Sequence, residues 1–120
     1  MTIITVLGSD ADSVVANTNW TEVASSEFTI DGTSEFVIFI SCEFTNAATN
    51  RIAGVRILLD GVERAFTHGT PVVANEFMVF APILVETINA GLHTLTIEAR
   101  TSNIASATTI RRKRLVVMKH

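Results

Sequence analysis

The alternation of apolar and polar residues constrains the fold of this chain more than any other feature of its sequence. In Leu92–Arg100, the apolar residues Leu95, Ile97 and Ala99 are separated by polar ones. A period of two indicates a half-buried β-strand, because successive side chains leave opposite faces of a sheet. The pattern recurs along the whole chain, and no segment of any length has a helical period. The sequence therefore predicts an all-β protein.

Turn residues divide the chain into about eight to ten predicted strands. Asp60-Gly61 separates Ile52–Leu59 from Val62–Thr67 and predicts a hairpin of the type I′ kind, because both turn residues tolerate positive φ. Pro82 interrupts Val72–Val85 and cannot donate to a ladder, so we expect it at a sheet edge or bulge. The other expected strands are Thr2–Leu7, Trp20–Val23, Glu27–Ile30, Glu35–Thr45, Leu92–Arg100 and Ala107–Met118.

The length of 120 residues predicts one domain, 1–120, built as a jelly-roll-like β-sandwich of antiparallel strands. Residues 1–19 are expected to form a first strand or arm and a polar loop, and residues 20–120 the sandwich. Glu35–Thr45 is apolar on both faces over its first half, which predicts a central strand. An immunoglobulin domain fits less well, since its Cys…Trp…Cys signature is missing.

The hydrophobic content of 48% and the mean hydropathy of +0.39 are high for a small soluble chain. Small domains leave much of their surface exposed, so we expect a partner to cover part of it and favour an oligomer. No apolar run approaches the roughly 20 residues that a membrane helix needs. Met1–Leu7 also lacks the basic and long apolar regions of a signal peptide. We therefore expect neither a membrane partner nor export.

The charges are distributed unevenly. Residues 1–50 hold seven acidic residues and no Lys or Arg, whereas four consecutive bases, Arg111, Arg112, Lys113 and Arg114, lie near the other end. This asymmetry can steer an acidic face onto the basic face of a neighbour. It can equally be internal, with a basic strand or bulge beside an acidic strand. Nucleic acid is the weaker hypothesis, because no aromatic residue follows Phe80 to stack on bases.

Residues with catalytic or metal-binding chemistry are few and scattered. His68, expected in a loop, His93 and His120 lack the spacing of a metal site, which needs several converging ligands. Cys42 lies in the most apolar strand, so we expect a buried, inert thiol. Trp20 is either an exposed binding anchor or, as we favour, a plug in the core or an interface. We expect no enzyme, no metal and no cofactor.

Some segments resemble known families. Trp20-Thr21-Glu22-Val23 followed by Glu27-Phe28-Thr29-Ile30 resembles the opening of the trimeric tumour-necrosis-factor/C1q-like jelly rolls. Three further segments resemble small jelly-roll proteins of tailed bacteriophages: Gly54–Gly61, Ala90–Arg100 and Arg114-Leu115-Val116-Val117-Met118. The resemblance covers most of the chain, but its motifs are weak.

This resemblance implies a virion structural protein, made in the host cytoplasm and located on the capsid. The first hypothesis is a capsid decoration (cement) protein that binds the major capsid protein or other virion proteins as a homotrimer and stabilises the shell. The alternative is a receptor- or glycan-binding head of a phage tail or baseplate fibre. Such a head is expected to make its contacts through loops such as Asn46–Asn50 and Thr101–Ala105.

Two segments are the expected protein-interface residues. The arm would pair with the edge of a neighbouring sheet through its main chain. The basic cluster would supply the polar contact with the partner. These candidates are Thr2, Ile3, Ile4, Thr5, Val6 and Leu7 in the arm, and Arg111, Arg112, Lys113 and Arg114 in the cluster.

Overall fold

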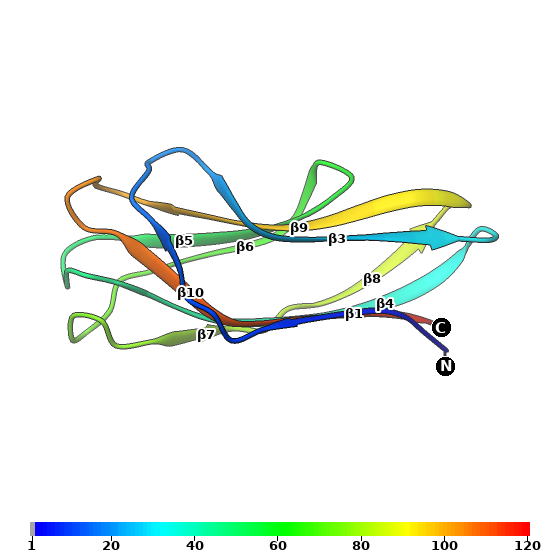
Figure 1. Ribbon diagram of the computed structural model, residues 1–120, viewed down its shortest axis with the longest axis horizontal. Coiled ribbons are helices and arrows are strands. Elements are labelled where there is room, and N and C mark those ends of the chain that lie inside the picture. Colours follow the sequence, from blue (N-terminus) through cyan, green and yellow to red (C-terminus); the bar gives the residue numbers. More distant parts are fainter. Residues whose placement is uncertain (1) are drawn as a thin grey trace.

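A computed structural model describes residues 2–120 and shows ten β-strands and no helix within them. This range therefore contains no helix that is long and apolar enough to cross a membrane. The strands form two layers that lie face to face (Figure 1). Their bounds are β1 Thr2–Ser9, β2 Ser13–Val15, β3 Thr21–Ile30, β4 Ser34–Asn46, β5 Ala53–Leu59, β6 Val62–Gly69, β7 Met78–Phe80, β8 Ile83–Ile88, β9 Gly91–Thr101 and β10 Thr108–Lys119.

Both sheets are antiparallel throughout. In sheet A, β10 and β4 pair at the centre, β1 and β2 pair with the outer edge of β10, and β7 and β8 pair with the outer edge of β4. Sheet B has the order β3-β9-β5-β6. The all-β sandwich predicted from the alternation is therefore confirmed.

The hydrophobic core lies between the sheets. On β4 the side chains of Phe36, Ile38 and Ile40 point inward and are at most 3% exposed. Across the core, Ile57 of β5 and Ile97 of β9 are fully buried. Burial of this kind contributes about 25 cal/mol for each Å² of apolar surface removed from water. β4 pairs with strands on both of its edges and therefore lies at the centre of sheet A, as predicted.

Cys42 also belongs to this core, with 2% exposure. Burial raises the pKa of its thiol to about 12, because the low-dielectric interior disfavours the thiolate. The predicted buried thiol is thus confirmed, and its high pKa makes it a poor nucleophile.

The structure confirms the predicted hairpin at Asp60-Gly61 and the predicted position of Pro82. Asp60 and Gly61 have φ values of 51° and 80°, as a type I′ hairpin requires. Pro82 lies between β7 and β8, the two short strands on one edge of sheet A, which confirms its expected position.

Some boundaries differ from the prediction. β3 is one continuous strand and not two, because Ser25 and Ser26, between the two expected strands, pair in regular register with β9, and the only register shift in this pairing lies before them, between Glu22 and Ala24. The segment expected to be a polar loop contains β2, where Val15 enters the core. His68, expected in a loop, lies in β6.

The two ends of the sandwich are built differently. At one end the buried side chain of Asn46 joins the loops that follow β4 and β9. Its Nδ2 lies 3.0 Å from Thr101 Oγ1 and 3.2 Å from the Ser106 carbonyl oxygen, and its Oδ1 accepts from the Ala48 N–H at 3.1 Å. The two chain ends lie together at the other end of the molecule (Figure 1), where Thr2 is paired with Lys119.

Candidate functional site

The outer surface of sheet A carries a band of apolar side chains across its whole width. Residues paired across neighbouring strands point to the same side of a sheet, so their side chains form rows. Two such rows make up what we call the outer apolar face: Ile3, Met118, Val37 and Val85 in one, and Val6, Val116, Phe39 and Ile83 in the other.

The outer apolar face is open to solvent. Its side chains on the edge strands are between 60% and 63% exposed, and Phe39 near the centre is still 38% exposed. A cavity of about 350 Å³ adjoins Phe39 and is lined by Pro82, Ile83 and Val116, among others. A contiguous apolar patch of this kind marks an interaction surface in soluble proteins.

Next to this band, the same surface of sheet A becomes charged. Nε of Arg111 donates to Oε1 of Glu43 at 2.7 Å, and Arg112 reaches the second carboxylate oxygen at 3.1 Å. The hydrogen bond from Arg111 is the main reason that the pKa of Glu43 is lowered. The Arg111 guanidinium also lies 3.5 Å from the centre of the Phe77 ring. An acid of the first half of the chain and bases of the second therefore meet within one molecule.

A β-bulge separates the four consecutive bases. The register of β10 against β4 shifts between Arg111 and Arg114, and Arg112 has a φ of 50°. Lys113 consequently points inward and is 3% exposed. Its Nζ donates to the Ala11 carbonyl at 2.9 Å and to Ser13 Oγ at 2.7 Å, and burial lowers its pKa. The expectation that Lys113 makes a surface contact therefore has to be corrected.

Arg112 and Arg114 are the two bases of this cluster that remain exposed. Their side chains are 60% and 47% exposed, whereas that of Arg111 is 33% exposed and packed on Phe77. Arg114 hydrogen-bonds to Asp10, and this bond lowers the pKa of the aspartate. Their role in binding a partner stays a prediction.

The expected arm is strand β1, which pairs along its length with β10 of the same chain. A bulge between Ile3 and Thr5 turns Ile3 and Val6 outward. Ile4 and Leu7 pack against the core, and Thr5 Oγ1 lies 3.3 Å from the Ser26 hydroxyl of β3. Within residues 2–120 the other edge of β1 has no partner strand, so its main chain remains open to a neighbour.

The outer surface of sheet B carries an aromatic and cationic cluster that sequence reasoning missed. The guanidinium groups of Arg56 and Arg100 lie 4.7 Å and 4.3 Å from the centre of the Trp20 ring, and the His68 ring stacks on it at 6.0 Å. Trp20 is half-buried on this surface and is not part of the hydrophobic core. These residues come together only through the register of the sheet, which no local motif reports.

No protein-family model matches the sequence, and no curated protein matches it either. Solved structures do match. The VP2 subviral particle of infectious bursal disease virus aligns with a TM-score of 0.64 and 12% identity, over 97% of this chain and 32% of the VP2 chain. The Eiger TNF of S. frugiperda aligns with a TM-score of 0.62 and 7% identity, over 100% of this chain and 94% of the other. The fold is a jelly-roll β-sandwich.

Sugar-binding proteins are also among the similar structures. The C-terminal domain of the sugar-binding protein EclA aligns with a TM-score of 0.59 and 12% identity, over 89% of this jelly roll and 78% of that chain. This chain spans 19% of the similar insecticidal δ-endotoxin Cry8Ea1. Identities this low establish the fold alone, since one jelly-roll fold serves many functions.

Proposed function

We propose that this jelly roll is a virion structural protein, a capsid decoration protein that forms a homotrimer through the outer apolar face. The observation that carries the proposal is this face, where two rows of apolar side chains cross β1, β10, β4 and β8 of sheet A. The similar viral VP2 structures and the resemblance to trimeric jelly rolls support this assignment.

The layout of sheet A matches the usual arrangement of a subunit interface. Such interfaces have an apolar centre and a polar rim. Here Phe39 and Val116 lie in the two central strands, and the ion pairs of Arg112 and Arg114 lie along one side. Three copies packed by this face would remove from water the side chains that a monomer leaves exposed. Their apolar area would supply the main driving force for assembly.

The exposed bases suit the contact with the shell. An exposed ion pair contributes less than about 1 kcal/mol, so one copy of Arg112 would bind weakly. A trimer bound at three points gains through effective concentration, and weak single contacts then give durable attachment. We therefore assign Arg112 and Arg114 to the polar contact with the capsid. The open edge of β1 is a further pairing site.

Light scattering at micromolar concentration tests the trimer. We expect a mass three times that of the 13.0 kDa chain. Val116→Lys places a charge within the outer apolar face and should give monomers with an unchanged circular-dichroism spectrum. Leu92→Lys, at a 64% exposed apolar residue on sheet B, is the matched control and should stay trimeric. A monomeric wild-type protein would contradict the proposal.

Co-sedimentation with capsids that lack the protein tests the capsid assignment. We expect the wild-type protein to bind and Arg112→Glu to bind more weakly, with a difference that becomes smaller at higher salt, because salt screens exposed charges. The alternative is a receptor- or glycan-binding head, for which the joined loops after β4 and β9 form a suitable surface. Adsorption to host cells or glycans without capsid binding would replace the first assignment by the second.

A further inference from the structure

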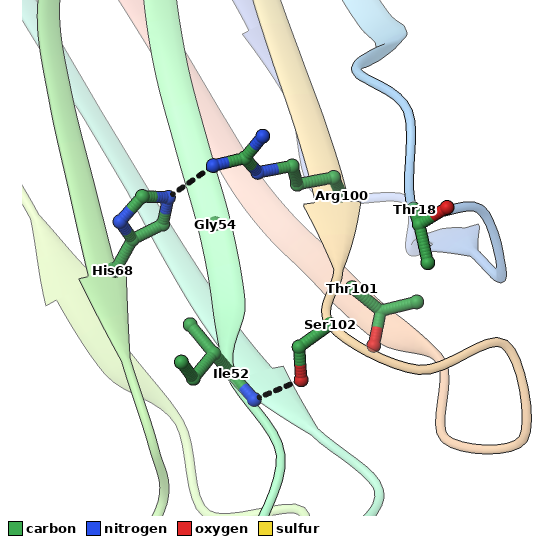
Figure 2. Close-up of a pocket in the computed structure, with 7 residues that line it drawn as sticks. All are labelled: Thr18, Ile52, Gly54, His68, Arg100, Thr101 and Ser102. Atoms are coloured by element: carbon green, nitrogen blue, oxygen red, sulfur yellow. Dashed lines mark hydrogen bonds between the residues drawn. The ribbon is translucent and has the colours of Figure 1, made fainter.

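A hollow on the outer surface of sheet B lies beside the Trp20 cluster and has a volume of about 260 Å³ (Figure 2). His68 of β6 and Arg100 of β9 form its walls on either side of Gly54 of β5, and Ile52 and Ser102 close it below. Thr18, from the segment before β3, lies beyond Arg100. The hollow is smaller than the cavities of about 300 to 1,000 Å³ that hold drug-sized ligands, and it suits a single small group.

The absence of a side chain at Gly54 lets the two walls of the hollow approach each other closely. A Cβ atom at this position would lie 2.9 Å from Cδ2 of His68 and 3.1 Å from Cγ of Arg100. Both distances are too short for van der Waals contact, so a larger residue would push the two walls apart. Glycine therefore allows these two polar side chains to meet over the strand.

Within residues 2–120, Arg100 differs from the arginines around it because no carboxylate pairs with it. In the described residues, Arg56 pairs with Glu98 at 2.6 Å and Arg64 with Glu86 at 3.6 Å. The Arg100 guanidinium instead hydrogen-bonds to Nε2 of His68, at 3.1 Å. Arg100 thus brings a positive charge with unused N–H donors to the hollow.

The Arg100 guanidinium is held in position before any ligand binds. The Trp20 ring supports the guanidinium at 4.3 Å, and His68 holds its outer nitrogen. Such support lowers the entropy lost when an arginine binds a ligand. On the lower wall, Ser102 Oγ accepts the N–H of Ile52 at 2.8 Å, so its hydroxyl hydrogen is left to donate to a ligand.

We propose that this hollow binds an oxyanion, such as a carboxylate or sulfate, with Arg100 as its main donor. The planar guanidinium matches such groups by two parallel hydrogen bonds. The hydroxyl groups of Ser102 and Thr18 suit a ligand with a hydroxylated body, such as an acidic monosaccharide. The hollow lies on sheet B, away from the outer apolar face, and a monomer presents it fully. The proposal therefore stands independently of the trimer and of the capsid.

Titration of the ¹⁵N-labelled full chain with D-glucuronate, D-glucose or sodium sulfate, at constant ionic strength, tests the site. We expect glucuronate to shift the amide signals of Gly54, His68 and Arg100 in a saturable way, and glucose to leave them unchanged. If sulfate binds as tightly as glucuronate, the site is one for a free anion. If glucuronate binds more tightly than sulfate, the site is one for acidic sugars. Both results support an oxyanion site.

Three variants complete the experiment. Arg100→Gln should weaken glucuronate binding by about tenfold or more, as expected for the loss of a charged hydrogen-bond donor. Gly54→Ala should weaken it, because the added Cβ pushes His68 and Arg100 apart. Arg64→Gln, on neighbouring β6, is the matched control and should bind like the wild type. Unchanged amide dispersion would show that the variants fold. The proposal is overturned if glucose binds as well as glucuronate, if neither anion shifts these amides, or if Arg100→Gln binds normally.

Discussion

His93 and Asp60 show how two side chains can join two turns of the sandwich. Nδ1 of His93 lies 2.6 Å from Oδ2 of Asp60, and its Nε2 lies 2.6 Å from the Asn89 carbonyl oxygen. Asp60 also accepts the N–H of Thr94 at 2.9 Å. Both ring nitrogens face acceptors, an arrangement that favours the imidazolium form. The hydrogen bond to Asp60 is the main reason that the pKa of His93 is raised. Burial opposes ionisation of Asp60, but the hydrogen bonds from His93 and Thr94 outweigh it and lower its pKa.

These two pKa shifts predict a window of pH for the stabilising effect of the pair. The pKa of His93 is raised by folding, so its contribution is complete below about pH 6.5 and is lost as the pH rises through the folded pKa. The pKa of Asp60 is lowered, so its contribution is present above about pH 4 and is lost as the pH falls further. His93→Gln should therefore lower the urea midpoint more at pH 5.5 than at pH 9.

The comparison of urea midpoints at the two pH values needs a histidine control. His120→Gln, at the exposed end of the chain, should change the midpoint little at either pH. A loss of stability in His93→Gln that is equal at pH 5.5 and pH 9 would show that the ion pair does not contribute.

The sequence predicted the Asp60-Gly61 turn because turn chemistry is local. It did not predict the contact with His93, which lies 33 residues away and depends on the pairing of β5 with β9.

The bulge in β10 shows, at the scale of a strand, the same difference between local features, which the sequence predicts, and long-range ones, which it does not. The sequence predicted the strand as Ala107–Met118, close to the observed Thr108–Lys119, and its residues Leu115 and Val117 are buried. A run of four bases gives no sign of where the extra residue is inserted, because all four positions look polar. The structure places the insertion between Arg111 and Arg114, which sends Lys113 inward. The register against β4 and β1 decides this, and register is a property of the whole sheet.

The left-handed backbone of Arg112 makes the bulge testable by substitution. Glycine adopts a φ of 50° without steric cost, whereas a β-branched residue is strained there. We expect Arg112→Gly to keep the wild-type stability within about 1 kcal/mol, and Arg112→Val to lose about 1 to 3 kcal/mol. Urea unfolding measures both. Thr109→Val, in a regular part of β10, is the control and should be nearly neutral. Equal stability of the glycine and valine variants would argue against the bulge.

At the scale of the whole molecule, the sequence predicted only in part that sheet A has a buried inner face and an exposed apolar outer face. The high hydrophobic content indicated a covered surface, and Glu35–Thr45 was read as apolar on both sides. From the sequence alone, that pattern does not distinguish a second covering layer from an open face. The structure shows the outward side chains of Val37 and Phe39 without a layer over them. The missing information is the topology, because it places β4 in a two-layer sandwich and not in a three-layer one.

The distribution of polar groups also predicts the behaviour of the molecule toward metals. In residues 2–120 no group of three or more His, Cys, Asp or Glu side chains is placed to hold a metal ion. We propose that the protein binds no stoichiometric metal. A chelator should leave its thermal midpoint unchanged, and elemental analysis should find far less than one transition metal per chain. A stoichiometric metal would contradict this, because metal sites need several converging ligands.

The antiparallel pairing of β1 with β10 brings the two chain ends to the same pole of the elongated sandwich (Figure 1). Any segment joined to either end therefore leaves the molecule there, beyond the short edge that carries Thr2 and Lys119. The loops held by Asn46 occupy the opposite pole. A fluorescent label or displayed peptide attached at either end would thus project along the long axis, and both broad surfaces of the molecule would remain uncovered.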